Sequence, residues 1–186
     1  MNPSGADAAV GERGTSATPA AQRPGAEYLE YLLFTCRGVA CAAPLHELRE
    51  VLRAVPPSVP IPFSPAWLLG VFTLRTDLLG LVDPAPMLFG AAWAESISPV
   101  PAPVATLIVG FDEARLGLAV GPIGEIVAIR PNEIEPIPLP DDASAVPNYI
   151  RGRYQSARSP ESYAVVDLAP FIAALLRALG EGADHA

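Results

Sequence analysis

An internal repeat constrains this chain more than any other feature of its sequence. The order of residue types from Leu45 to Val51 returns 75 residues later, and further matches follow in order at spacings of 76, 82 and 84 residues. The matched residues are Leu45, Leu48, Glu50 and Val51 with Val120, Ile123, Glu125 and Ile126; Ile61-Pro62 with Ile137-Pro138; Trp67, Gly70 and Phe72 with Tyr149, Gly152 and Tyr154; Val82-Asp83 with Val166-Asp167; and Ala85-Pro86 with Ala169-Pro170. A spacing that only grows is what loop insertions into a second copy produce. The sequence therefore predicts two structurally similar halves, at about 27–90 and 104–173.

The spacing of the apolar runs predicts an all-β fold. Each half contains about five short runs, bounded by Gly, Pro or Asp at intervals of roughly 8–12 residues, which is typical of a small barrel or sandwich. The 22 prolines and 15 glycines also favour short strands over long helices. Only two stretches look helical. Pro44 to Arg49 suits one or two turns, and Pro170 to Leu179 predicts a C-terminal helix that stops at Gly180 and covers one barrel end.

Two tails flank the predicted folded region of 27–180, and one linker interrupts it. Residues 1–26 are small and polar without periodicity, so we expect a disordered tail. Residues 91–103, rich in Pro, Ala and Ser, predict an exposed linker, and 181–186 a short tail. No apolar run reaches the roughly 18 residues of a membrane-spanning helix, and the first stretch lacks the apolar core of a secretory signal. We therefore expect the cytoplasm.

The charged residues exclude several classes of function. All 12 basic residues are Arg, set against 20 acidic residues, and the formal net charge is −8. The absence of lysine excludes Schiff-base chemistry and a lysine-dependent phosphate loop. An acidic chain without a basic run also argues against nucleic acid or an anionic membrane as the main partner.

The residues that serve as nucleophiles and metal ligands are scarce. Cys36 and Cys41 lack Cys-x-x-Cys spacing, and no histidine cluster completes a zinc site, so we expect buried reduced thiols. His46, the one histidine inside the predicted fold, is expected at the surface. Asp83 and Asp167 occupy the same place in each repeat, before a Pro-led turn, which suits capping of backbone N–H groups better than a catalytic pair. We predict no enzyme activity, no cofactor and no metal.

One long stretch carries a family resemblance. Gly70, then Thr73-Leu74-Arg75-Thr76, an apolar run and Val82-Asp83 follow one another, preceded by Leu45 to Leu52 and by an opening run from Glu27 to Phe34. Arg115 to Ile129, Tyr149 to Gly152 and Val165 to Leu168 continue the pattern in the second half. In order and spacing, these motifs resemble CheW-like domains, the adaptors that couple chemoreceptors to a CheA-type histidine kinase. The resemblance covers roughly 27–179 and implies two SH3-like five-stranded barrels packed together, in agreement with the repeat.

The resemblance also implies partners and a binding surface. A receptor-facing groove between the barrels would be bordered by Leu48, Glu50, Val51, Gly70, Thr73, Leu74 and Arg75. Leu48 and Leu74 would supply contact area for the helical tip of a receptor, while Glu50 and Arg75 would set its register. Arg75 could instead be structural, paired with Asp77 or another acid. The regulatory domain of the kinase shares the family's fold, so edge-to-edge pairing of barrels is implied, with contact residues unknown. Recruitment to membrane receptor arrays follows from the same resemblance.

Two departures leave alternatives open. Thr76 stands where the family has Gly, and a β-branched residue neither adopts a positive φ readily nor permits close backbone approach. Pro84 follows Val82-Asp83 and should end the strand there. The chain could therefore serve a non-swimming chemosensory or type IV pilus pathway, and bind or sequester another signalling protein rather than a receptor. A small enzyme or ligand carrier with a β-barrel pocket is a third reading, which lacks polar catalytic residues.

Overall fold

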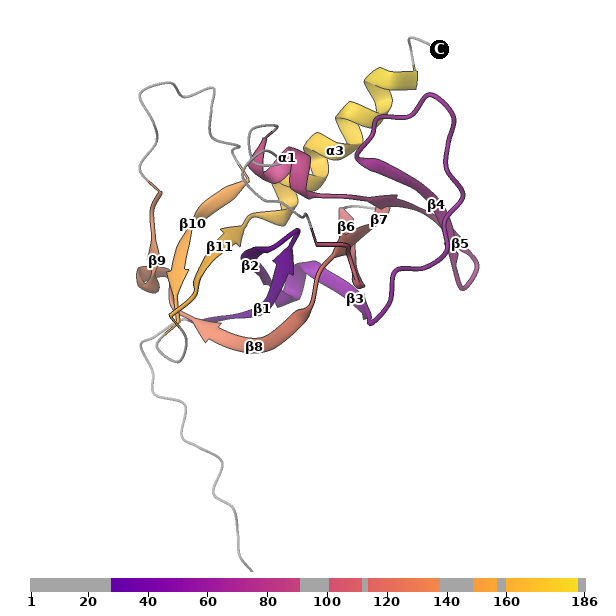
Figure 1. Cartoon of the computed structure of the whole chain (residues 1–186). Coiled ribbons are helices and arrows are strands. Elements are labelled where there is room, and N and C mark those ends of the chain that lie inside the picture. Colours follow the sequence, from indigo (N-terminus) through magenta and orange to yellow (C-terminus); the bar gives the residue numbers. More distant parts are fainter. Residues whose placement is uncertain (1–27, 91–100, 112–113, 138–148, 157–159, 184–186) are drawn as a thin grey trace, which may run out of the picture.

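The computed structural model describes residues 28–90, 101–111, 114–137, 149–156 and 160–183, and the predicted N-terminal tail and most of the predicted linker lie outside these ranges. The all-β fold is confirmed: two sheets and few helices make up the described chain (Figure 1). The strands are β1 Leu29–Cys36, β2 Val39–Pro44, β3 Leu48–Leu52, β4 Leu68–Leu74, β5 Asp77–Val82, β6 Ala105–Phe111, β7 Ala114–Val120, β8 Ile123–Ile129, β9 Ile134–Glu135, β10 Ile150–Gln155 and β11 Ser162–Val166. The helices are η1 Leu45–Glu47, α1 Ala85–Phe89, η2 Pro131–Glu133 and α3 Leu168–Ala183.

The two sheets do not correspond to the two halves of the sequence. One sheet has six strands in the order β8-β1-β2-β11-β10-β9, and the other has five in the order β3-β6-β7-β5-β4. The β1–β2 hairpin of the first half thus pairs with strands of the second half, and the β6–β7 hairpin of the second half pairs with strands of the first. The expectation of one barrel within 27–90 and another within 104–173 is therefore corrected: the halves exchange hairpins.

The repeat itself is visible in matched details of the two sheets. Parallel pairing occurs once in each, between β5 and β7 and between β11 and β2. The β4–β5 register shifts between Leu68 and Gly70, and the β10–β11 register shifts between Ile150 and Gly152, the residues that the repeat aligns. The N–H of Asp83 donates to the carbonyl of Trp67 at 2.8 Å, and the N–H of Asp167 donates to that of Tyr149 at the same distance. The sequence repeat is therefore a structural one.

Alternate residues of β1 enter two different cores. Leu32 and Phe34 belong to a large core shared by both sheets and α3, whereas Tyr31 and Leu33 belong to a core inside the six-stranded sheet. The five-stranded sheet has its own inner core around Phe72. Because successive side chains of a strand point to opposite faces, a strand buried on both faces reads as a continuous apolar run, as β1 does. The two sheets therefore pack against each other over one shared core.

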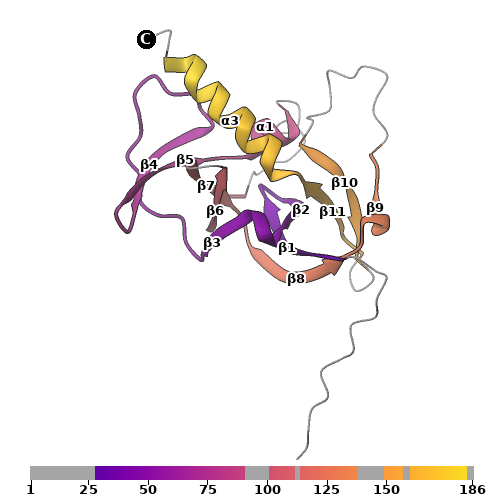
Figure 2. The same cartoon turned by 180° about the vertical axis from the view of Figure 1, so that it is seen from behind.

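The helices differ from the prediction in extent and place. The C-terminal helix was expected at 170–179, but α3 runs from Leu168 to Ala183 and continues past Gly180, around which the structure leaves open space. Phe171, Ile172 and Leu175 enter the shared core, and α3 runs over the five-stranded sheet from the end of β11 (Figures 1 and 2). The first helical stretch is a single turn, η1, and α1 was not predicted, although the repeat aligns Pro86 with Pro170.

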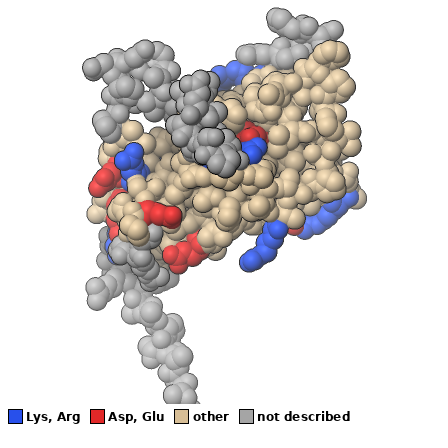
Figure 3. Space-filling view, viewed as in Figure 1, with Lys and Arg blue, Asp and Glu red and all other residues tan. Residues whose placement is uncertain are grey.

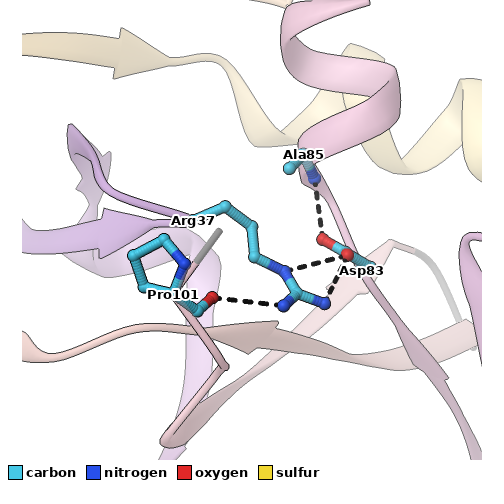
Figure 4. A network of polar contacts seen from close by, with 4 residues as sticks. All are labelled: Arg37, Asp83, Ala85 and Pro101. Atoms are coloured by element: carbon cyan, nitrogen blue, oxygen red, sulfur yellow. Dashed lines mark hydrogen bonds and ion pairs between the residues drawn. The ribbon is translucent and has the colours of Figure 1, made fainter. Parts of the chain in front are cut away.

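An ion pair joins the two sheets where β5 ends (Figure 4). Arg37, at the tip of the β1–β2 hairpin, donates to Oδ2 of Asp83 from Nε at 3.0 Å and from Nη2 at 2.7 Å, and its Nη1 donates to the Pro101 carbonyl at 3.1 Å. Oδ1 of Asp83 accepts from the Ala85 N–H at 3.2 Å, which confirms the predicted capping role. Among the described residues, no equivalent side-chain cap involves Asp167. The predicted end of the strand before Pro84 is also confirmed, since β5 ends at Val82.

Candidate functional site

A pocket of about 530 Å³ opens on the five-stranded sheet, beside the tip of the β4–β5 hairpin. Three residues predicted for the receptor-facing groove line it: Glu50 from β3, Leu74 from β4 and Arg75 from the turn. The other lining residues, which sequence reasoning missed, are Arg49, Asp77, Ile108, Gly110 and Arg115. The structure thus gathers residues from five strands and one turn into a single mixed-charge pocket.

The turn of the β4–β5 hairpin places Arg75 over this pocket. Leu74 pairs with Asp77, so Arg75 and Thr76 form a two-residue loop. Arg75 adopts φ +56°, and Thr76 does not belong to the residues with positive φ. The left-handed conformation expected to need Gly at position 76 therefore falls one residue earlier. An Arg at positive φ is uncommon and costs of order 1 kcal/mol, which the surrounding strand pairing must offset.

Two ion pairs cross the pocket. Nη2 of Arg75 lies 3.1 Å from Oε2 of Glu50, and Nη1 of Arg115 lies 2.8 Å from Oδ2 of Asp77. Arg75 thus pairs with Glu50 and not with Asp77, the first acid considered for it. The Arg75 side chain is 75% exposed, and exposed pairs contribute only about 0–1 kcal/mol to stability. The pair therefore orients Arg75 more than it stabilises the fold.

A β-bulge explains why two neighbouring residues of β3 line one pocket. In a regular strand, Arg49 and Glu50 would point to opposite faces. The register between β3 and β6 shifts, however, because Leu48 pairs with Val109 and Glu50 with Ile108. Arg49 is thus the extra residue of a bulge, and bulges re-aim side chains. No sequence pattern predicts this irregularity, which is why Arg49 was missed.

A second pocket, of about 220 Å³, lies where the two sheets meet. Val51 and Arg53 line it from the first half of the chain, and the β6 and β8 segments line it from the other side with Val104, Ala105, Ile123 and Gly124. It contains the predicted residue Val51, which is 36% exposed. The position predicted for the groove, between the barrels, corresponds to this pocket, whereas Glu50 and Arg75 line the first one.

The remaining predicted residues line neither of these two pockets. Leu48 is half-buried and packs against the shared core. Gly70 has φ +139°, and a Cβ at this position would collide with the carbonyl of Val59. Thr73 is exposed on β4. Gly70 therefore permits close approach of the 53–67 loop to β4, where Val59 and Val71 exchange backbone hydrogen bonds of 2.8 and 2.9 Å.

The sulfur and imidazole groups offer little chemistry. Cys36 and Cys41 are buried free thiols, as predicted, and burial raises the pKa of Cys41 to about 12 and also raises the pKa of Cys36. Neither thiol forms the thiolate readily at neutral pH. His46 is exposed at the surface, as predicted. Within the ranges that the structure describes, no three His, Cys, Asp or Glu side chains gather as metal ligands.

A partly buried carboxylate, that of Glu47, lies in η1. Burial raises the pKa of Glu47, and the negative charge of Asp167 raises it further. Its Oε2 is buried and has no hydrogen-bond partner among the described residues. Burial likewise raises the pKa of Tyr31, to which both carboxylates contribute. This cluster bears on stability and lies apart from both pockets.

Charged side chains are unevenly distributed over the face shown in Figure 3. In Figure 3, basic atoms protrude where β3 ends and the β4–β5 hairpin turns, and acidic atoms gather mostly toward β8 and β9. The chain as a whole is acidic, with a net charge of −8. The first pocket therefore lies in a basic region of an acidic protein. No helix in the described part of the chain is long and apolar enough to cross a membrane.

Comparison with known proteins places this architecture. The family model described as CheW-like domain matches residues 30–174. Among solved structures, the chain is similar to the scaffolding protein TtCheW from Thermoanaerobacter tengcongensis, with a TM-score of 0.63 and 16% identity. The match covers 82% of this chain and 93% of that one, and at this identity it shows the fold. A search of curated protein sequences found no significant match. The family match extends from β1 into α3, across both sheets, and the chain belongs to the CheW-like domain family.

Proposed function

We propose that this protein is a non-enzymatic adaptor that couples chemoreceptors to a CheA-type histidine kinase. The observation that carries the proposal is the convergence of Glu50, Leu74 and Arg75, three positions of the family's receptor-facing motifs, on one pocket of a CheW-like fold. The scarcity of nucleophiles and the buried state of both thiols favour binding over catalysis. An adaptor needs only two surfaces held in a fixed relation by a rigid body.

The receptor surface proposed here is the 530 Å³ pocket and its rim. Leu74 gives an apolar contact for a helix that lies across the β4–β5 tip, in the helix-in-groove mode. Arg75 presents its guanidinium from a turn whose backbone is held by strand pairing on both sides, and Glu50 orients it. Little side-chain freedom would then be lost on binding, which favours affinity.

The kinase surface would use a sheet edge, since the kinase's regulatory domain shares the fold. The five-stranded sheet ends in β3 and β4, and the six-stranded sheet ends in β8 and β9. Near β4, Val59 and Leu78 are 69% and 71% exposed, large values for apolar side chains. Val59 already pairs with Val71 of β4, so exposed apolar side chains around this edge would supply the contact with another barrel. Val59 lies outside the hairpin that carries Arg75, whereas Leu78 pairs with Thr73 beside the hairpin tip, so Val59 is the residue with which the kinase surface can be tested separately.

Substitution of Arg75 tests the receptor role. Arg75→Ala should weaken binding of the purified cytoplasmic tip of a chemoreceptor by roughly 5- to 150-fold, because a well-placed charged hydrogen bond contributes about 1–3 kcal/mol. Its melting temperature and its binding of the kinase regulatory domain should match the wild type, since the Arg75–Glu50 pair is exposed. Arg130→Ala is the matched control, since Arg130 also forms an exposed ion pair but lies beyond β8 in the other sheet.

Two results would count against the proposal. Unfolding of Arg75→Ala would make the residue structural. Unchanged receptor binding by a folded Arg75→Ala would instead favour the other proposal, in which a CheW-like module of a non-swimming or type IV pilus pathway holds a different signalling protein. Thr76 motivated that alternative, but it lies in the turn without a positive φ, so its conformation does not support the alternative.

A further inference from the structure

We propose that Arg49 recognises a carboxylate of the partner protein, and that the pocket on the five-stranded sheet accepts an Asp or Glu side chain from the docking helix. This inference rests on the proposed function for the identity of the partner. It adds the chemical group, a carboxylate, by which the protein would recognise that partner. Nothing in the family resemblance or the repeat pointed to Arg49.

The described lining of the pocket contains one more basic side chain than acidic side chains. Its lining includes Arg49, Arg75 and Arg115 together with Glu50 and Asp77. Arg75 pairs with Glu50 and Arg115 with Asp77, and in the described part of the chain no acid lies within ion-pair distance of Arg49. A planar guanidinium with all its donors available is the group that binds carboxylates in a two-point geometry.

The backbone is shaped to place this cation in the pocket. The bulge between Leu48 and Glu50 turns Arg49 to the same side as Glu50. Gly110 of β6 leaves the space over which the Arg49 side chain lies, since a Cβ there would come within 3.3 Å of Arg49 Nε and 3.4 Å of the Ala114 carbonyl. A bulge on one strand and a glycine on the next thus hold Arg49, which has no ion-pair partner among the described residues, in an open pocket.

The same charges favour a carboxylate over a phosphate group. Among the described residues that line the pocket, three Arg and the two acids Glu50 and Asp77 leave a single excess positive charge. One carboxylate matches that charge, whereas a dianionic phosphate would meet repulsion from both acids. Leu74 lies on the same wall and suits an apolar side chain one helical turn from the acid. An acidic helix of a partner protein meets both requirements.

The first arm of the test needs no receptor. The side-chain Nε–H signal of Arg49 is followed by NMR in the full-length protein while N-acetylglutamate amide is added, with N-acetylglutamine amide and inorganic phosphate as comparison probes. We expect a saturable shift with the glutamate derivative alone, absent from Arg53 in the neighbouring pocket. A shift that fails to saturate, or one that is larger with phosphate, overturns the inference.

The second arm uses the receptor tip. Arg49→Gln should weaken receptor binding about 10-fold or more, with the loss shrinking as salt screens the contact. Arg53→Gln removes the same charge from a residue near the end of the same strand and should have little effect. Arg49→Lys keeps the charge without the planar fork and should fall between the two. Equal melting temperatures show that all variants fold.

The two arms separate this inference from the proposed function. Loss of receptor binding in Arg75→Ala with none in Arg49→Gln leaves the adaptor role standing and makes the inference wrong. A saturable carboxylate shift at Arg49 in a protein that binds no receptor supports the inference and overturns the receptor role. The absence of a carboxylate shift at Arg49, together with no receptor binding by the wild-type protein, overturns both proposals.

Discussion

Removal of the Asp83 carboxylate should destabilise the whole protein, because one side chain joins the two sheets. Oδ2 of Asp83 accepts two hydrogen bonds from Arg37, and Oδ1 accepts one from the N–H of Ala85. The two side chains are only 19% and 13% exposed, so solvent screens the pair little. Asp83→Ala leaves the Arg37 guanidinium with the Pro101 carbonyl as its one remaining acceptor in the described structure.

The expected cost follows from these contacts. Hydrogen bonds to a charged group contribute about 1.5–3 kcal/mol, and loss of a helix cap costs about 1 kcal/mol. Asp83→Ala should therefore lower the free energy of unfolding by about 3 kcal/mol. A domain of this size loses roughly 2–4 °C of melting temperature per kcal/mol, so the midpoint should fall by about 6–12 °C.

A double-mutant cycle with Arg37→Ala isolates the pair itself. Urea unfolding of the wild type, both single variants and the double variant gives the interaction energy, which we expect to be about 1.5–3 kcal/mol. The Ala85 cap cancels from this difference. An interaction energy near zero would refute the reasoning, since it would mean that the sheets are held by the shared core alone and that the ion pair only occupies their junction.

Three further predictions concern stability. Gly70→Ala should lower the free energy of unfolding in urea by about 2–4 kcal/mol, because it combines an unfavourable φ with loss of the backbone hydrogen bonds to Val59. Gly180→Ala, at a position surrounded by open space, should be neutral or slightly stabilising. Equal effects of the two substitutions would contradict this account. The raised pKa of Glu47 favours the folded state at pH values below the ordinary Glu pKa near 4.5, and this stabilisation is lost as the pH rises through the raised pKa. Glu47→Gln should therefore raise the melting temperature at pH 7 but not at pH 4. An effect that does not depend on pH would exclude titration of Glu47 as its cause. A fragment of residues 27–90 should be unfolded or aggregate, since β1, β2, β3 and β5 all lose partner strands from the second half, and dispersed amide resonances would disprove it.

The local features of the fold were predictable from short-range patterns. The positions of β5 and β11 follow from apolar runs that end at Val82-Asp83 and Val166-Asp167, where Pro or a helix start must break the ladder. The capping role of Asp83 follows from its place before a Pro-led turn. The helix after β11 was found because apolar residues recur with helical spacing, but its end was misplaced, since Gly180 lowers helix propensity without forbidding a helix that the shared core already holds.

The site was predictable only in part. Family motifs led to Glu50, Leu74 and Arg75, which the fold brings to one pocket, and to Val51, which it places in another. Arg49 and Arg115 carry no local signal, because their position depends on a bulge between β3 and β6 and on pairing across the sheet. Registers of this kind are set by packing between segments distant in the chain.

The sequence alone determined that the chain is all-β, that it repeats, and that one strand ends before Pro84, because strand periodicity, glycine and proline act within a few residues. Only the tertiary structure decided which strands pair. The repeat makes β1–β2 and β6–β7 near-equivalent hairpins, so each could in principle complete either sheet, and local propensity cannot distinguish the two arrangements. The observed arrangement, in which the two halves exchange hairpins, packs both sheets and α3 over a single core. It is selected by the burial of apolar side chains that only the assembled fold achieves, so it is a property of the whole chain.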